Sequence, residues 1–367
     1  MADTSEMAHT PPTIYDVARA AGVSIASVSR VLNGRRNPRE ETRERVLQAV
    51  AELGFIPDGA ARALSGQLKE VVGVVIRRVR WVETSDDAFA EEDESLIFTD
   101  VINRGIELAA QRQGFNLLLS SVDVDDHDVS GRLFALARKS DGLILHDRVL
   151  EPEQLQELAR RVPVVTLANV ATRTTTNVHS DNSAGMRDLA RHLLDDHGYR
   201  SIGFVAGLAD SPDSEARAET LAAQAQAGGA TLLTGPRWRG NYYAAGGARV
   251  IERLIADRAA LPRAIACAND QTALGVMYAL AQHGIDVPGD VAVTGFDDIP
   301  MARHLRPQLT TVRQPIQEIG ATAFDVLHAM ISNGAPPERD VVLPTRLIVR
   351  ASCGCPSPSN SPSWRLA

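Results

Sequence analysis

Hydrophobic and polar positions recur along this chain with two different spacings. Between residues 13 and 53, apolar residues fall three or four positions apart, which is the spacing of amphipathic helices. From residue 71 onward, short β-branched runs alternate with segments of helical spacing. The runs predict strands at 71–76, 115–120, 142–146, 163–167, 202–207, 231–234, 264–269 and 291–296; the other segments predict helices around 100–113, 127–138, 152–161, 182–197, 214–227, 242–257 and 271–283. This alternation predicts parallel sheets with helices on both faces.

The first two helices are joined by a short link. Thr13 and Asp16 form a capping-box pattern that starts a helix, and Gly22 ends it. Ser24 can cap a second helix over residues 25–33. Ala18 is small enough to let the two helices cross closely, and Val28 is expected to pack between them. Two short helices joined this tightly predict a helix-turn-helix.

A third helix completes this N-terminal module. Asn37 is placed to cap it, Pro38 to occupy its first position, and Gly54 to end it. Its apolar face consists of Val46, Ala49, Val50 and Leu53. We therefore expect an all-α module over residues 13–57.

Composition sets the class of protein. The chain has 367 residues, of which 44% are apolar and 23% charged, as in globular proteins of two or three domains. The first 12 residues carry Asp3 and Glu6 and no basic residue, unlike a secretory signal. Apolar runs such as 71–76 are far shorter than the roughly 20 residues of a membrane span. Three cysteines make no disulfide framework, so we expect a cytoplasmic protein.

Charge is unevenly distributed. The whole chain carries a net charge of −8, whereas residues 13–69 contain nine basic and six acidic side chains, a net charge of +3. A basic module on an acidic body is expected where only the module meets phosphates. Residues 83–94 contain seven acids and no basic residue. This segment is either a solvated loop or a lid that selects a cationic or amino-substituted ligand.

The N-terminal residues resemble a known family. TIYDVARAAGVSIASVSRVLN at 13–33, with ETRERV at 41–46 and LGFIP at 53–57, is similar to the headpiece of the lactose-repressor (LacI/GalR) family of bacterial transcription regulators. The resemblance implies that DGAARALS at 58–65 forms the short hinge helix that follows this headpiece. Arg39 departs from the family, whose members usually have there the serine that caps the third helix.

Position within the module assigns roles in DNA binding. Ile25, Ala26, Ser29 and Arg30 lie at the start and on the outward face of the second helix, where a major-groove reader meets base edges. Arg30 can fork onto a guanine. The side chains placed for phosphates are Thr13, Tyr15, Ser24, Ser27 and Asn33. The resemblance implies that Leu64 wedges into the minor groove. The alternative is a plain three-helix bundle in which Arg30 is a solvated surface residue.

The energetics of recognition call for two copies of the module. One reading helix offers about three base contacts at roughly 1–3 kcal/mol each. That is too little against the roughly 10⁶ or more competing sites of a genome. We therefore expect a homodimer on a pseudo-palindromic operator.

The number of predicted strands after residue 70 favours two sheets over one. The resemblance implies the same: two doubly wound lobes of periplasmic-binding-protein type. The chain would cross between them near residues 168–171, 298–301 and 333–337. The expected boundaries are a hinge and linker at 58–70, a first lobe at 71–169 plus 299–332, a second lobe at 170–298 plus 333–350, and disordered tails at 1–12 and 351–367.

Four residues are candidates for binding a small effector. Ligands of such folds bind at the carboxyl ends of strands. Segments 266–274 and 293–299 resemble family segments that contact the effector, which implies roles for Asn269 and Asp297. Loops 207–217 and 240–243 similarly imply Arg217 and Tyr242. A carboxylate, a guanidinium and an amide around an aromatic ring suit a pyranose. The alternative is structural bonding, which is the role we expect for Asp270 and Asp298 as helix caps and for Asp181 with Asn182.

Metal and cofactor sites are not expected. His127 lies among four acidic residues, Asp123, Asp125, Asp126 and Asp128. Such a cluster could bind a metal, but we predict that this segment is a loop followed by a helix cap. Cys353 and Cys355 have no second pair nearby in the sequence, so structural zinc is not predicted. The tail after Cys355 has no heptads, and nothing in it predicts a coiled coil.

These features together predict a ligand-gated repressor of sugar-catabolic or transport genes. Its partners would be double-stranded DNA, a sugar effector and a second copy of itself, with no cofactor and no membrane. A nucleoside, a purine or another metabolite is the alternative effector. An exported solute-binding protein would share the lobes but have no use for the headpiece. An enzyme would need a nucleophile with its base, or a phosphate loop, and the sequence has no Walker-type, Gly-x-Ser-x-Gly or His-Glu-x-x-His motif.

Overall fold

The computed structural model describes residues 12–32, 39–55, 68–78, 96–123, 128–146, 148–168, 172, 174–334 and 338–356. The chain divides into two compact units, Met1–Lys69 and Glu70–Ala367. Among the described residues, no helix is both long and apolar enough to cross a membrane.

The N-terminal unit contains helices α1 (Ile14–Ala21), α2 (Ile25–Leu32) and α3 (Glu40–Leu53). The Asp16 carboxylate accepts hydrogen bonds from the amide and the hydroxyl of Thr13, at 2.9 and 2.6 Å, which fixes the start of α1. Gly22 is left-handed, with φ of 63°, and ends it. The three helices bury Val17, Val28 and Val46 completely. The predicted helix-turn-helix is therefore confirmed.

Helix α3 begins later than the sequence suggested. Its N-cap is Arg39 and its first residue is Glu40, so the helix starts two residues after the predicted position. The predicted cap, Asn37, lies outside the described residues, as do residues 1–11. Gly54 ends the helix in the left-handed conformation, as predicted, and Leu53 is 37% exposed and contributes little to the core.

The first lobe of the C-terminal unit is built on a parallel sheet in the order β11-β5-β4-β3-β1-β2. Its strands are β1 (Val71–Arg78), β2 (Asn116–Asp123), β3 (Gly142–His146), β4 (Val164–Leu167), β5 (Thr176–Ser180) and β11 (Asp340–Leu343). The helices are α6 (Leu96–Arg112), α7 (Val129–Ala137), α8 (Pro152–Ala159) and α13 (Ile316–Asn333). Helix α7 is capped by Asp128, whose Oδ1 accepts from Gly131 N at 3.0 Å, so the predicted helix cap at this position is confirmed.

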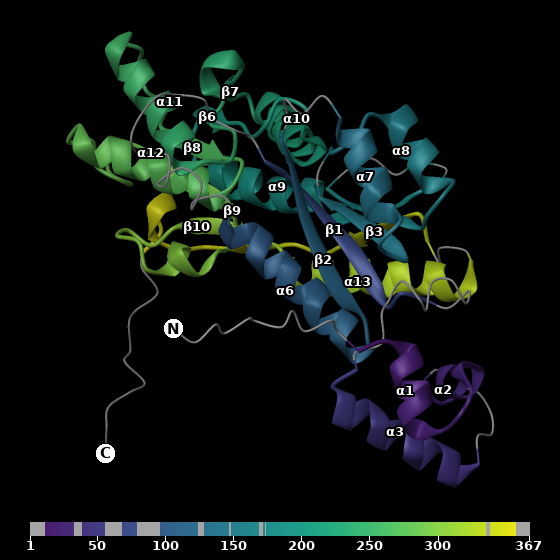
Figure 1. Ribbon diagram of the computed structural model, residues 1–367. Helices are drawn as coiled ribbons and strands as arrows, with labels where there is room; N and C mark the ends of the chain where they lie inside the picture. The colour runs from purple at the N-terminus through teal and green to yellow at the C-terminus, as the bar shows by residue number, and fades with distance from the viewer. Residues whose placement is uncertain are drawn as a thin grey trace, which may run out of the picture. The chain divides into compact units, whose positions relative to one another are not determined.

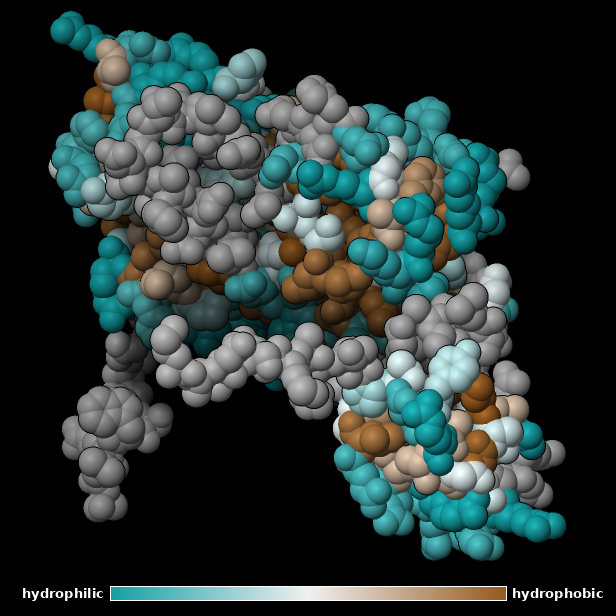
Figure 2. Space-filling model, viewed as in Figure 1, coloured by the Kyte–Doolittle hydropathy of each residue, from teal (hydrophilic) through white to brown (hydrophobic). Residues whose placement is uncertain are grey.

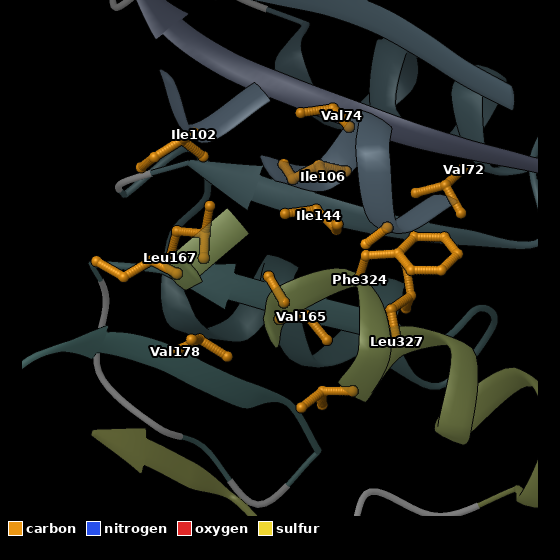
Figure 3. Close-up of a cluster of buried hydrophobic side chains, with 14 of the residues drawn as sticks. Val72, Val74, Ile102, Ile106, Ile144, Val165, Leu167, Val178, Phe324 and Leu327 are labelled. Atoms are coloured by element: carbon orange, nitrogen blue, oxygen red, sulfur yellow. The ribbon is translucent and has the colours of Figure 1, made fainter. Parts of the chain in front are cut away.

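Helices α6 and α13 pack against each other beside one face of this sheet (Figure 1). Side chains of the strands and of both helices form one core, in which Phe324 and Leu327 of α13 lie against Val72 and Val165 (Figure 3). The helices approach closely because Gly105 and Gly320 lie at their crossing. A Cβ on Gly105 would lie 2.0 Å from Gln317 O.

The second lobe repeats this plan in the order β12-β10-β9-β8-β6-β7, with only β12 antiparallel to its neighbour. Its strands are β6 (Ser201–Val205), β7 (Thr231–Leu233), β8 (Ala264–Cys267), β9 (Ala292–Asp297), β10 (Thr310–Arg313) and β12 (Arg346–Ile348). The α-helices are α9 (Asn182–Arg191), α10 (Pro212–Ala227), α11 (Ala244–Ala256) and α12 (Asp270–Gln282). A π-helical turn, η1 (His192–Asp196), extends α9, and short 3₁₀ turns lie at η2 (Pro236–Trp238), η3 (Pro300–Arg303) and η4 (Ala351–Cys353). The α/β fold with two parallel sheets agrees with the prediction.

The chain crosses between the lobes at different points from those predicted. The crossings follow β5, β10 and β11, whereas we expected them near 168–171, 298–301 and 333–337. Each crossing therefore lies one strand later. The predicted assignment of 170–180 and 340–343 to the second lobe, and of 299–313 to the first, is wrong because these strands lack the long apolar runs that marked the others.

The C-terminal residues after 350 also differ from expectation. Residues 351–356 are described, and Ala351, Ser352 and Cys353 are buried. The Ser352 hydroxyl donates to Val293 O, and Thr310 N donates to the Ser352 oxygen at 2.8 Å. This part of the predicted tail is therefore an ordered part of the second lobe, and residues 357–367 lie outside the described residues.

Candidate nucleic-acid interface and ligand cleft

The predicted DNA-binding residues of α1 and α2 that the structure describes are all at least partly accessible to solvent. Side chains of Thr13, Tyr15, Ser24, Ile25, Ala26 and Arg30 are exposed, and those of Ser27 and Ser29 are half-buried. Tyr15 is 63% and Ile25 40% exposed, although both are large and apolar or aromatic. Figure 2 shows apolar and polar side chains interspersed over the surface of this unit. A small module that leaves such side chains in water offers them to a partner.

The start of α2 is held by its own serines. Ser24 Oγ accepts from Ser27 N at 3.2 Å and lies 3.0 Å from Ser27 Oγ, so Ser24 caps the helix as predicted. Arg30 donates from Nε to Ala26 O at 3.1 Å, which steadies the side chain along the outer face of α2. This bond leaves the two Nη groups as the fork that could meet a guanine edge. Asn33, Leu64 and the predicted hinge helix at 58–65 lie outside the described residues, as does the acidic segment 83–94.

The C-terminal unit contains a cleft between its two lobes. The cleft is lined from both sheets by residues at or just beyond the carboxyl ends of strands, including Arg77, His146, Ser180, Asn269, Asp297 and Gln314. It encloses about 1010 Å³, counting the solvent at its mouth. All four predicted effector residues, Arg217, Tyr242, Asn269 and Asp297, line it. The topology thus brings together residues that lie up to 80 positions apart, as the rule for parallel sheets predicts.

Arg217 is the buried cation of the cleft. Its Nε donates to Asn182 Oδ1 at 2.8 Å and its Nη1 to Ala268 O at 2.6 Å, while Nη2 lies 3.4 Å from Asp213 Oδ2. The guanidinium carbon is 3.7 Å from the centre of the Phe296 ring. These bonds use three of the five N–H donors, so the side chain is fixed and can still donate to a ligand.

Asp297 is the buried carboxylate of the cleft. It ends β9 with a φ of 124° and is 3% exposed. Its Oδ1 accepts a hydrogen bond from Gln314 Nε2. Burial raises the pKa of Asp297 to about 7, against the opposing effect of the nearby Arg217 guanidinium. Near neutral pH this carboxyl can therefore accept from a ligand hydroxyl or, when protonated, donate to one.

Asn269 and Tyr242 are bonded to each other and to the frame of the cleft. Asn269 is the N-cap of α12, because its Oδ1 accepts from Thr272 N at 2.9 Å, and its Nδ2 donates to Tyr242 O at 3.0 Å. Tyr242 has a φ of 73° and its hydroxyl lies 2.8 Å from Ser211 Oγ. The Tyr242 ring covers Gly207, where a Cβ would lie 2.3 Å from it. Both side chains therefore have structural bonds as well as a place in the cleft wall.

Asp270 and Asp298 do not have the helix-capping roles that we predicted. Asp270 accepts from Ile299 N at 2.9 Å and from the Thr311 hydroxyl, and so ties α12 to β10. Asp298 accepts from Arg313 Nε at 2.7 Å and from Arg350. The N-caps of α12 and η3 are Asn269 and Ile299. The predicted cap at Asp181 is confirmed, since its Oδ1 accepts from Ala184 N at 2.8 Å.

The first lobe and the crossings contribute cleft residues that were not predicted from the sequence. Ser180 ends β5 and donates to Gln314 Oε1, and Gln314 follows β10. Arg77 of β1 reaches across the mouth of the cleft, with Nη1 2.8 Å from Asp210 Oδ2 in the second lobe. None of these residues belongs to a motif, so only the strand order could have placed them.

His146 is a further buried polar group in the first-lobe wall. It ends β3 and is 7% exposed, and burial lowers its pKa to about 4. Its Nε2 has no hydrogen-bond partner among the described residues. A buried polar atom left without a protein partner costs free energy, which a ligand or water in the cleft would recover. Phe98, Ile102 and Leu167 make this same wall largely apolar.

Comparisons with known proteins agree with both units. The chain matches the model of bacterial regulatory proteins of the lacI family over residues 13–58 and that of a periplasmic binding protein-like domain over residues 190–353. It is 33% identical over 344 residues to catabolite control protein A of Priestia megaterium, covering 93% of this chain and 98% of that protein.

Solved structures show the same architecture. A lac repressor dimer bound to operator and the anti-inducer ONPF is 26% identical, with a TM-score of 0.79 over 94% of this chain and 99% of that one. A complex of the transcriptional regulator CelR with cellobiose is 28% identical, with a TM-score of 0.64 over 93% of this chain and 99% of that one. Other curated relatives are the transcriptional regulator GalR of Escherichia coli, 32% identical over 94% of this chain and 96% of that protein, and the ribose operon repressor of Haemophilus influenzae, 30% identical over 93% of this chain and 98% of that protein. This chain therefore belongs to the lacI family of bacterial regulatory proteins, which bind operator DNA and respond to small-molecule effectors.

Proposed function

We propose that this regulator represses genes of carbohydrate catabolism or transport and that a sugar bound between the lobes controls its affinity for the operator. The observation that carries the proposal is that Arg217 and Asp297 both line the cleft, close enough for the guanidinium to affect the pKa of the carboxyl. A fixed guanidinium and a carboxyl that titrates near neutrality offer the donors and acceptors that the adjacent hydroxyls of a pyranose require. The cellobiose complex of CelR is a precedent in a similar protein.

The apolar wall of the first lobe supports a sugar over a charged metabolite. Phe98 and Ile102 provide a surface for the CH face of a pyranose. His146, whose pKa of about 4 keeps it neutral, adds a polar atom without a charge. Closing the lobes would place this wall over a ligand held by the second lobe.

Repression would act through a homodimer on a pseudo-palindromic operator. Arg30, Ile25, Ala26 and Ser29 would meet base edges, while Thr13, Tyr15, Ser24 and Ser27 would meet phosphates. A difference of roughly 1–3 kcal/mol between the DNA affinities of the two lobe arrangements would change occupancy about 5- to 150-fold. Such a change suffices for a metabolic switch.

The test joins a thermal-shift screen with DNA binding. The full chain is screened against monosaccharides, disaccharides, nucleosides and purines, and its operator is selected from a random pool of duplexes. We expect one sugar to raise the melting temperature and to change operator affinity at least fivefold.

Asp297→Asn is the matched variant for this test, and Asp257→Asn, on the surface of the same lobe, is its control. The first should lose the sugar response and keep DNA binding, whereas the second should keep both. A purine or nucleoside that produces the only response, or a sugar response that survives in Asp297→Asn, would overturn the proposed effector or the proposed site.

A further inference from the structure

The fold brings together two histidines and two cysteines at the far end of α9. His192 lies in the π-helical turn η1 and His197 follows it, while Cys353 ends η4 and Cys355 comes two residues later. One potential ligand atom of each residue lies within 4.8 Å of those of the other three. The histidines and the cysteines are about 160 positions apart in the chain, with 161 separating His192 from Cys353.

Four of the six distances between these atoms lie close to the edge lengths of a tetrahedral metal site, and the other two are within 4.8 Å. His192 Nε2 lies 3.2 Å from His197 Nε2, 3.3 Å from Cys353 Sγ and 3.7 Å from Cys355 Sγ, and His197 Nε2 lies 3.4 Å from Cys355 Sγ. With Zn–N of about 2.0–2.1 Å and Zn–S of about 2.3 Å, a regular tetrahedron has ligand-to-ligand edges of about 3.3–3.8 Å. Ordinary hydrogen bonds among these side chains would not require all four donor atoms to surround one position.

Neighbouring groups orient the two histidines. His192 Nδ1 lies 2.8 Å from Asp196 Oδ2, and when Nδ1 carries the proton that this contact requires, the Nε2 lone pair faces the cluster. Such a carboxylate partner on the remote nitrogen is usual for metal-bound histidines. The His197 ring stacks on Tyr199, with ring centres 5.1 Å apart. Asp196 and Tyr199 therefore hold the imidazoles in a ligating arrangement.

The cysteine segment is shaped to reach the histidines. Tyr199 donates from its hydroxyl to Cys353 O at 2.8 Å. Gly354 between the cysteines has a φ of 105°, and a Cβ there would lie 2.9 Å from the Tyr199 hydroxyl and 3.4 Å from the His197 ring. A residue other than glycine would therefore disturb the turn that points both sulfurs the same way.

We propose that His192, His197, Cys353 and Cys355 bind a structural zinc ion. Two imidazoles and two thiolates whose donor atoms lie within 4.8 Å of one another are a donor set that zinc prefers, whereas calcium and magnesium require oxygen ligands. Four protein ligands leave no open position, as in structural rather than catalytic sites. Zinc was not predicted from the sequence because Cys353 and Cys355 have no second pair of ligands near them in the chain.

Zinc at this position would join the C-terminal segment to α9. The same segment carries Ser352, which is bonded to β9 and β10, and follows Arg350, which pairs with Asp298 beside the cleft carboxyl Asp297. The ion would thus stabilise the segment that supports Asp298 and Asp297, without contacting a ligand in the cleft.

The first test is the metal content of the full chain, purified without chelators. We expect about one zinc ion per chain, measured by inductively coupled plasma mass spectrometry. Exchange for Co²⁺ should give the visible bands and the thiolate-to-cobalt charge-transfer band of a tetrahedral site. Protein without zinc that also gives no charge-transfer band with Co²⁺ overturns the proposal, as does a Cys353–Cys355 disulfide in protein kept under reducing conditions.

Variants separate these ligands from other cysteines and histidines. Cys355→Ser and His197→Asn should weaken zinc binding at least 10–100-fold, measured by competition with a chelator, since even the supporting residues of such sites contribute that much to affinity. Cys267→Ala, in β8, and His304→Asn, on the surface, should keep it. A strong zinc chelator should lower the melting temperature of the full chain. Cys355→Ser with undiminished zinc would refute the ligand assignment, and if the variants fail to fold, the cobalt spectrum of the unmodified chain decides.

Discussion

Gln314 donates a hydrogen bond from Nε2 to Oδ1 of Asp297. Its Oε1 also accepts from Ser180. Ser180 ends β5 and Gln314 directly follows β10, and the chain crosses between the lobes after each of these two strands. The cleft carboxyl is therefore bonded to two of the three crossings. A ligand that changes the bonding of Asp297 therefore acts directly on the segments about which the lobes move.

Stability should depend on the ionisation of Asp297. Its pKa is about 7 in the folded chain and near 3.8 when unfolded. Between these values the folded state binds more protons, so the stability due to this group is complete below pH 3.8 and is lost as the pH rises to 7. In Asp297→Asn the side chain does not titrate, so this loss of stability with rising pH is absent. We expect the melting temperature of the variant minus that of the unmodified chain to grow from pH 4 to 7 and to level off above pH 7.

Glu318→Gln, at an exposed carboxyl on α13, is the control for the loss of a charge. Its melting temperature should differ from that of the unmodified chain by a nearly constant amount over the same range. A flat difference for Asp297→Asn as well would show that its carboxyl titrates in the ordinary range.

Arg217→Lys should damage the cleft although it keeps the charge. Lysine cannot reproduce the planar fork that bonds Asn182 and Ala268 while it stacks on Phe296. We expect a loss of about 1–3 kcal/mol in the free energy of unfolding, measured by urea titration, and no thermal shift with the effector. Arg253→Lys, at an exposed position in α11, should change neither quantity. An unaltered effector response in Arg217→Lys would count against the role of the guanidinium.

Arg30→Ala should lower selectivity for the operator. Loss of a guanine contact costs about 1–3 kcal/mol at one base position, whereas loss of a phosphate contact weakens binding to every sequence alike. Arg19→Ala removes an exposed positive charge from α1 and is the matched control. It should leave selectivity among DNA sequences unchanged. Binding is measured against the selected operator and a scrambled duplex at several salt concentrations. Equal selectivity in the two variants would exclude Arg30 as a reader of bases.

Gly105→Ala should destabilise the first lobe although alanine favours helices. The gain in helix propensity is about 1 kcal/mol. The new Cβ would lie 2.0 Å from the backbone oxygen of Gln317, however, so α6 and α13 would have to separate. Overpacking of this kind costs typically 1–3 kcal/mol. After the gain in helix propensity is subtracted, we expect a net loss of up to about 2 kcal/mol in urea titration. Gln111→Ala, on the exposed side of α6, should have little effect, and a more stable Gly105→Ala would disprove the close crossing.

Elements could be predicted from the sequence where their local hydrophobic pattern is typical of a helix or a strand. Strand β3 is a continuous apolar run that is buried throughout, and it was predicted with its bounds. Strand β5 is also buried, but it contains Thr176 and Asn177, whose polar groups are satisfied by bonds such as that from Thr166 to Asn177. Strand β5 buries hydrogen-bonded polar residues where other strands bury apolar ones. Its sequence pattern therefore does not differ from that of a loop.

The candidate cleft was predictable only in part for a related reason. Asn269 and Asp297 belong to segments that resemble the family, so each could be proposed alone. Ser180, Gln314 and His146 enter the cleft through the order of the strands, which the local sequence does not specify. The same holds for His192 and Cys353, which are far apart in the chain and adjacent in the fold.

The C-terminal stretch that holds β11 and β12 supplies the outermost strand of both sheets. Until the ribosome releases these residues, each lobe presents an open strand, β5 in one and β10 in the other, to any nascent chain nearby. Loss of the chain from β11 onward would leave two incomplete sheets. A late frameshift should therefore cause aggregation of the whole polypeptide instead of merely shortening its end.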